Sequence, residues 1–249
     1  MTQSGRGILG QYMHTPKLFL TGLILISSYP SWCQQESSSV VADEDSAYVN
    51  LLSDGRRLID AGNPNEAITE YFDRVLSEFD ATYGSSETRF YCARGSEESL
   101  LYLLTAAANE QSAEVLSSTW ADAHFMKGYA LLEMGRLSEA KPSIEQAVAL
   151  SPNNSQYLSE LGHIHQLEKD WSKALQYFQK AEDFAEAFSP PDVKAFELGV
   201  ARRGIGYVLV ELGRLDEAEE KYLQCLAANP NDARAKNELE YVRNLQTTQ

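Results

Sequence analysis

The residues that most often perform chemistry in proteins match no catalytic or metal-binding pattern in this chain. His163 and His165 are two residues apart, so on a helix they point to different faces and cannot chelate one metal ion together. A Gly-x-Gly sequence at residues 204–206 has neither a preceding strand nor the spacing of a phosphate-binding loop. None of the serines lies in a Gly-x-Ser-x-Gly pattern, which marks many serine hydrolases. We therefore expect no enzyme activity, no metal and no cofactor.

The charge balance excludes further classes of partner. The 249 residues include 36 acidic and 21 basic side chains, a formal net charge of −15. A field of this sign repels phosphate backbones and anionic lipid headgroups, so we expect neither nucleic acid nor a membrane surface as a partner. The hydrophobic fraction of 43% and the charged fraction of 23% are typical of a globular chain. The remaining partner class is another protein or a peptide, and self-association stays open.

Residues 1–33 have the pattern of a secretory signal peptide. They contain no acidic residue, and Arg6 and Lys17 precede an apolar run of nine residues at 18–26. A bilayer span needs about 20 apolar residues, so this run predicts export and no membrane span. Met13 would give a more compact signal than Met1, and either residue remains possible as the start.

The end of this segment predicts where the exported chain begins. Cleavage after Cys33 would place Ser31 and Cys33 at the two small-residue positions of the recognition site. Lipid anchoring at Cys33 is an alternative, although Trp32 stands where a lipoprotein signal has a small residue. The signal is of a bacterial type, which predicts a periplasmic protein. Residues 34–47 are polar and acidic and are expected to form a flexible tether.

An internal repeat of 34 residues dominates the rest of the chain. In each of four segments, a glycine is followed by an alanine after twelve residues and by a large apolar residue after sixteen. Glycine and alanine let two antiparallel helices approach closely, and the large residue fills the space between successive pairs. The four sets are Gly55, Ala67 and Tyr71; Gly128, Ala140 and Ile144; Gly162, Ala174 and Phe178; and Gly206, Ala218 and Tyr222. The polar residues Asn65, Ser138, Ser172 and Asp216 are expected to cap the second helices.

This pattern resembles the tetratricopeptide repeat (TPR). The resemblance implies an all-α fold, a right-handed α-solenoid of about five helix-turn-helix units with a C-terminal capping helix. The expected units of the array, which spans residues 48–232, are 48–81, a degenerate unit at 87–120, 121–154, 155–188 and 199–232, followed by a capping helix and tail at 233–249. The degenerate unit rests on Ala106, Ala113 and the helical spacing of leucines from Leu100. A ten-residue insertion precedes the last unit, so its first helix is expected to run from about Pro191 to Leu212.

The two cysteines outside the signal segment are not expected to form a disulfide. Cys92 and Cys225 lie in units three repeats apart. Because packed helix axes are about 8–10 Å apart, this separation exceeds the roughly 7 Å between Cα atoms that a disulfide tolerates. Cys225 occupies a position that is alanine in other units, so it is expected to be a small buried thiol.

The resemblance also implies where a partner binds. In this family the first helices line a concave groove, which suits recognition of a protein or peptide. Carried over position by position, the candidate groove residues are Phe125, Tyr129, Ser159, His163, Gln166, Arg203 and Tyr207. The groove is expected to centre on the last two units, with Arg203 as an anchor for a carboxylate or backbone carbonyl of the partner.

These expectations describe a periplasmic binding scaffold or adaptor, with three alternatives. The same architecture could serve as an outer-membrane-anchored lipoprotein in pilus or secretion assembly, or as a toxin-immunity protein. An enzyme subunit is a remote alternative, which would need a cluster of convergent polar residues in the groove. The identity of the partner is not encoded in any motif of the sequence.

Overall fold

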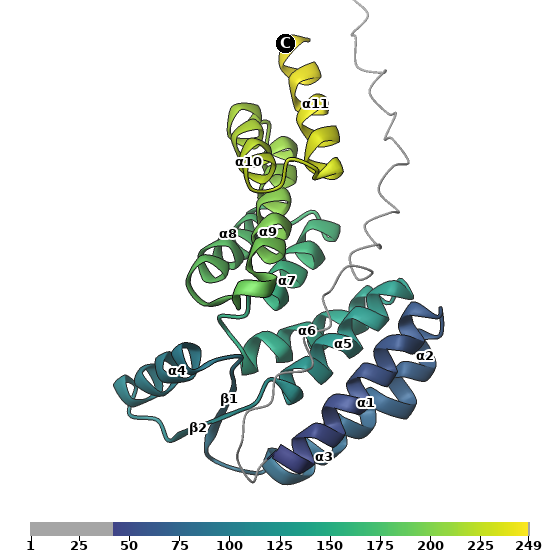
Figure 1. Cartoon of the computed structure of the whole chain (residues 1–249), viewed down its shortest axis with the longest axis vertical. Helices are drawn as coiled ribbons and strands as arrows, with labels where there is room; N and C mark the ends of the chain where they lie inside the picture. Colours follow the sequence, from purple (N-terminus) through teal and green to yellow (C-terminus); the bar gives the residue numbers. More distant parts are fainter. Residues whose placement is uncertain (1–41, 249) are drawn as a thin grey trace, which may run out of the picture.

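The computed structural model describes residues 42–248. The expected signal segment at 1–33, Cys33 and most of the expected tether lie outside these residues. Within them the chain is an all-α solenoid of antiparallel helix pairs, which rises from the pair of α1 with α2 and α3 at one end to α11 at the other (Figure 1). The tether was expected to extend to residue 47, but α1 (Ala42–Asp60) already begins at Ala42. None of the helices in the described part combines the length and hydropathy that a membrane crossing requires.

The first pair differs from the others by a π-helical turn in its second helix. This helix consists of α2 (Pro64–Ala67), the π-turn η1 (Ile68–Phe72) and α3 (Asp73–Tyr83). A π-turn contains about one more residue than an α-turn, so the side chains after it are shifted by one position. As a result Phe72, and not the expected Tyr71, is fully buried and lies nearest Gly55, where an added Cβ would come within 2.5 Å of the Phe72 ring.

Three further pairs follow the expected repeat spacing. Their helices are α5 (Thr119–Glu133) with α6 (Leu137–Leu150), α7 (Ser155–Leu167) with α8 (Trp171–Phe188), and α9 (Pro191–Glu211) with α10 (Leu215–Ala228); α11 (Ala233–Thr247) follows them. A Cβ added at Gly128, Gly162 or Gly206 would lie 2.6, 3.1 or 2.7 Å from the large residue of its own pair. The repeat alanines Ala67, Ala140, Ala174 and Ala218 are fully buried. Close helix approach is therefore the physical reason for the repeated small residues.

The residues expected to cap the second helices do not cap them. The second helices begin at Leu137, Trp171 and Leu215, ahead of the expected caps Ser138, Ser172 and Asp216. Likewise, Asn65 lies inside α2. Of these four second helices, only α8 has a side-chain N-cap, in which Asp170 accepts a hydrogen bond from the Lys173 N–H.

Each turn closes its first helix with a residue in the left-handed region. Gly62, Gly135 and Gly213 have φ of +82°, +71° and +73°, and Lys169 occupies the same place in the third turn with φ of +60°. In that turn the Asp170 N–H donates to the His165 carbonyl, a bond that ends many helices. Lys169 therefore adopts a backbone conformation that is strained for residues other than glycine.

The prediction of a degenerate helix pair at 87–120 is wrong. This segment forms a two-stranded parallel sheet of β1 (Arg89–Cys92) and β2 (Ala113–Leu116), connected by α4 (Ser96–Ala108). We call this segment, residues 89–116, the β–α–β insert. Ala106 is buried on α4 as a helix residue, but Ala113 opens a strand, so no second helix exists. In Figure 1, α4 lies to one side of the stacked pairs.

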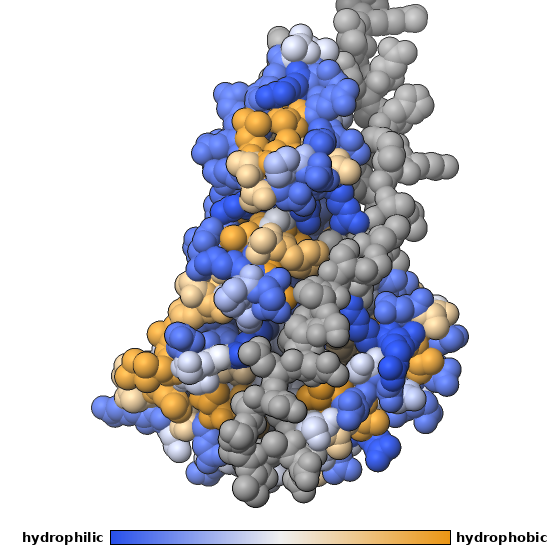
Figure 2. Space-filling model, viewed as in Figure 1, coloured by the Kyte–Doolittle hydropathy of each residue, from blue (hydrophilic) through white to orange (hydrophobic). Residues whose placement is uncertain are grey.

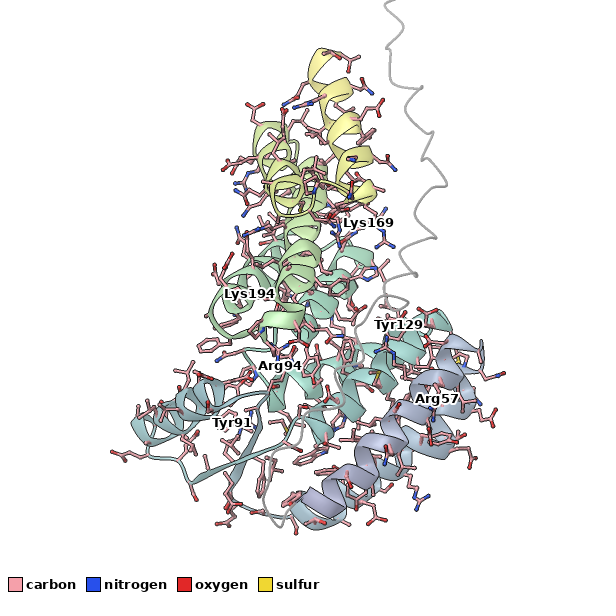
Figure 3. The ribbon with its side chains drawn as sticks, viewed as in Figure 1. Arg57, Tyr91, Arg94, Tyr129, Lys169 and Lys194 are labelled. Atoms are coloured by element: carbon pink, nitrogen blue, oxygen red, sulfur yellow. The ribbon has the colours of Figure 1, made fainter. Side chains whose placement is uncertain are left out.

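A network of buried polar contacts joins the β–α–β insert to the solenoid. The Ser151 hydroxyl donates to the Cys92 carbonyl at 2.5 Å, and the Asn153 N–H donates to the Tyr102 hydroxyl at 3.1 Å. The Arg94 guanidinium lies 2.7 Å from Oε1 of Glu197 on α9 (Arg94 is labelled in Figure 3). The side chains of this ion pair are 7% and 4% exposed, so the β–α–β insert and α9 share a charged contact in the core.

Both cysteines in the described part of the chain are buried, and neither forms a disulfide. Burial raises the pKa of the Cys225 thiol to about 11, and the carboxylates of Asp232 and Glu182 act in the same direction. This thiol is therefore protonated at neutral pH and is a poor nucleophile.

Candidate protein-binding surface

The first helices of the pairs form one side of the solenoid, which we call the first-helix face: the partly exposed side chains of α1, α5, α7 and α9. The helices α7 and α9 contact each other directly. Between α5 and α7, Phe125 stacks on Tyr157 with ring centroids 5.0 Å apart, and the Tyr157 hydroxyl donates to Asp122 at 2.5 Å. Successive first helices are thus held side by side, as a continuous binding surface requires.

Three of the seven candidate residues are buried. Phe125, Tyr129 and Ser159 are 3%, 9% and 6% exposed. The hydroxyl of Tyr129, labelled in Figure 3, donates to Glu133 one helical turn further along α5. These residues support the first-helix face from beneath and offer a partner little surface.

The other four candidates are partly exposed and lie on α7 and α9. They are His163, Gln166, Arg203 and Tyr207. The Tyr207 ring lies 6.4 Å from the Trp171 ring, and burial raises the pKa of Tyr207 to about 12, with Glu211 and Glu238 contributing in the same direction.

Arg203 already forms an ion pair with a carboxylate of its own chain. Its guanidinium pairs with the carboxylate of Asp232, and both side chains are mostly buried. Asp232 is the N-cap of α11, where its other oxygen accepts hydrogen bonds from the backbone N–H groups of Arg234 and Ala235. The structure therefore gives Arg203 a role in seating the capping helix, which the prediction of a partner anchor overlooked.

Carboxylates gather at the α1, α5 and α7 end of the face. Burial raises the pKa of Glu133, and the negative charges of Glu160 and Asp60 raise it further, although the Tyr129 hydrogen bond opposes them. His163 lies 3.4 Å from Glu160. Burial lowers the pKa of His163, but the contact with Glu160 outweighs this effect and raises it.

The first-helix face is therefore acidic at both ends, which the prediction centred on Arg203 missed. The sequence held a signal: Asp60, Glu133 and Glu211 each lie five residues after a repeat glycine. Acidic side chains at one repeat position are placed side by side by the solenoid.

Neither a surface hollow nor a cluster of metal ligands marks a site at α7 and α9 in the described part of the chain. A hollow lies between the first two pairs, lined by Asp73, His124, Lys127 and Ser143 among others, and thus away from α7 and α9. Burial lowers the pKa of His124 to about 4, so it is neutral at physiological pH. Within residues 42–248, no three His, Cys, Asp or Glu side chains gather closely enough to hold a metal ion.

Comparisons with known proteins identify the family. The family model described as tetratricopeptide repeat matches residues 125–190, and a second model with the same description matches residues 204–232. Residues 125–190 and 204–232 are tetratricopeptide repeats. The matched segments contain most of α5, all of α6 to α8, the end of α9 and all of α10, and thus include α7 and parts of α5 and α9 from the first-helix face. A search of curated proteins found no match.

Solved structures show the same fold at low sequence identity. PilF of Pseudomonas aeruginosa aligns over 82% of this chain and 71% of its own, with a TM-score of 0.56 and 16% identity. The first TPR domain of Spaghetti (RPAP3), solved with a bound HSP90 peptide, aligns over 53% of this chain and 97% of its own, with a TM-score of 0.47 and 20% identity. The family-model matches and the alignment with PilF identify an all-α TPR solenoid, an architecture that generally serves as a protein-interaction scaffold.

Proposed function

We propose that this chain is a non-catalytic, exported scaffold, and that its first-helix face binds an extended segment of a partner protein rich in lysine or arginine. The observation that carries the proposal is the convergence of carboxylates with partly exposed polar side chains. At one end Glu160 contacts His163 and lies near Glu133, and at the other end Glu211 lies beside Tyr207. Complementary charge sets the orientation and speed of association.

The charge of the face decides between a basic and an acidic partner. An acidic segment would need an unpaired cation, but Arg203 is bound to Asp232. A basic segment would find carboxylates at both ends of the face, and the Tyr207 ring beside Glu211 offers area and cation–π contact. A lysine or arginine in the partner therefore has more favourable contacts than an acid.

A site-specific photo-crosslinker tests the face directly. We would place it at Gln166 on the first-helix face and, as a matched control, at Gln224, a glutamine of α10 that is likewise partly exposed. The chain with the crosslinker at Gln166, produced in its native host, should form a discrete adduct with a protein that the Gln224 position does not capture. Equal capture from both positions would contradict the proposal.

Charge removal tests the expected chemistry of that partner. Changing Glu133 and Glu160 to glutamine keeps their shape and removes two negative charges, so the crosslinked adduct should fall by about tenfold at low salt. Its salt dependence should also weaken. An adduct that is unchanged, or that increases, would show that the partner is not held by basic side chains.

Export and a periplasmic location rest on the sequence of residues 1–33. We propose that the signal is cleaved after Cys33 and that the mature chain starts near Gln34. Cell fractionation with N-terminal sequencing tests this point. A diacylated Cys33 in the membrane fraction would instead establish the lipoprotein alternative.

A further inference from the structure

The helix α4 exposes an apolar face that no described part of the solenoid covers. Its inner side, Glu98, Tyr102 and Ala106, is buried. Its outer side carries Leu100, Leu103 and Leu104, which are 58%, 43% and 59% exposed, followed by the exposed Ala107 and Ala108. Figure 2 shows the resulting apolar patch at the place of α4 in Figure 1.

We propose that two copies of this chain pair through α4, side by side and antiparallel about a two-fold axis. The first argument is charge. From Ser99 to Asn109 the chain has no charged side chain, in a protein of net charge −15. Contact between two such molecules on most of their surface would bring many like charges together, whereas pairing through α4 brings together only the acids at the two ends of the helix.

The second argument is the order of large and small residues along α4. The leucines occupy the first part of the exposed stripe and the alanines the last part. In an antiparallel pair, Leu100 of one copy lies opposite Ala107 and Ala108 of the second copy, so large residues meet small ones at both ends. Leu103 and Leu104 then lie near the two-fold axis. A two-fold interface requires a surface that is complementary to itself in this way.

The contact area sets the strength of the pairing. The exposed side chains of α4 offer on the order of 300 Å² per copy, while a standard stable interface uses about 800 Å² per partner. We therefore expect a reversible dimer with a dissociation constant of roughly 10–100 µM. Because Glu97 and Glu110 lie near opposite ends of α4, antiparallel pairing brings acids of the two copies together, so added salt should tighten the dimer.

Sedimentation velocity tests the proposal. It is measured on the full chain as its host exports it, at protein concentrations of about 5–200 µM. The average mass should rise with concentration toward that of a dimer, and more so at high salt. A chain that remains a monomer throughout overturns the proposal and leaves α4 to a different protein. Association that weakens with salt also overturns it, because a basic surface would then be the contact.

Two variants that place opposite charges at the two-fold axis give a test that does not depend on loss of folding. Leu104→Glu and Leu104→Lys should each raise the dissociation constant at least about tenfold, because like charges then meet across the axis. An equimolar mixture of the two variants should regain a dimer containing one of each. The matched control is Leu223→Glu on α10, a leucine of 44% exposure, which should dimerise like the parent chain. Failure of the mixture to associate, or dimers of Leu104→Glu alone, would refute pairing through α4.

Discussion

The buried ion pair between Arg94 and Glu197 allows a quantitative test of how the β–α–β insert is held. Removing the guanidinium by Arg94→Met leaves a carboxylate that is 4% exposed, whose other hydrogen bond comes from the Ser189 hydroxyl. A buried charge that loses its partner costs about 3–5 kcal/mol. We expect Arg94→Met to lower the free energy of unfolding by that amount at pH 7.

The pair itself adds much less stability than this loss suggests. Two nitrogens of the guanidinium, Nε and Nη2, are buried without a hydrogen-bond partner in the described part of the chain, so desolvation of Arg94 is only partly compensated. Burial lowers the pKa of Arg94, but the charges of Glu197 and Glu98 outweigh it and raise this pKa, so the side chain stays charged. The double variant Arg94→Met with Glu197→Leu removes both charges and should lie within about 1.5 kcal/mol of the parent.

Urea unfolding followed by circular dichroism measures both variants and their coupling. The coupling free energy in the double-mutant cycle should be about 2–3 kcal/mol in magnitude. A matched control is Arg136→Met, which breaks an ion pair of similar distance whose side chains are 41% and 55% exposed and should cost less than about 1 kcal/mol. If Arg94→Met is no more harmful than Arg136→Met, the pair is solvated and the β–α–β insert is not held through it.

Four further predictions address the repeat framework. Lys169→Gly should raise the free energy of unfolding by about 0.5–1 kcal/mol in urea, because glycine adopts the left-handed region without strain. Ala140→Leu should destabilise by about 1–3 kcal/mol through overpacking, whereas Glu139→Ala should be nearly neutral in the same thermal melts. Burial raises the pKa of Glu182, but its hydrogen bonds from two basic side chains on α9 and α10 outweigh this and lower it. Glu182→Gln should therefore cost about 1 kcal/mol at pH 7, and this cost should shrink as the pH falls from the unfolded value near 4.3 through the lower folded pKa. Arg203→Ala should speed hydrogen exchange in α11 and leave partner capture nearly unchanged. Lost capture with unchanged exchange would instead support Arg203 as an anchor for the partner.

The sequence predicted the repeat register well because that register depends on local and periodic contacts. Gly128 and Ile144, or Gly162 and Phe178, meet within one helix pair, so their spacing is visible in any unit. The π-turn was not predictable in this way. It brings Phe72 against Gly55, and no residue type in its five positions distinguishes a π-turn from an α-turn.

The β–α–β insert could not be predicted because its signals are short and its contacts are distant. Strands of four residues give no clear alternation of polar and apolar side chains. The contacts that hold β1 come from far along the chain: Ser151 bonds to the Cys92 carbonyl, and Arg89 donates to the Ala149 carbonyl. The leucines from Leu100 do form a helix, as their spacing predicts, but they face outward.

The case of Arg203 shows why a position within a repeat does not determine what a residue does. Its repeat position predicts exposure toward a partner, yet the next element along the solenoid supplies Asp232, 29 residues away. Asp232 both caps α11 and pairs with Arg203, so one carboxylate ties the last helix to α9. Buried Ala235, Leu239 and Val242 pack α11 against the last pair, and the Asp232 contact adds a charged link to α9. With Arg203 paired to Asp232, the acidic residues of the first-helix face favour the basic partner that we propose.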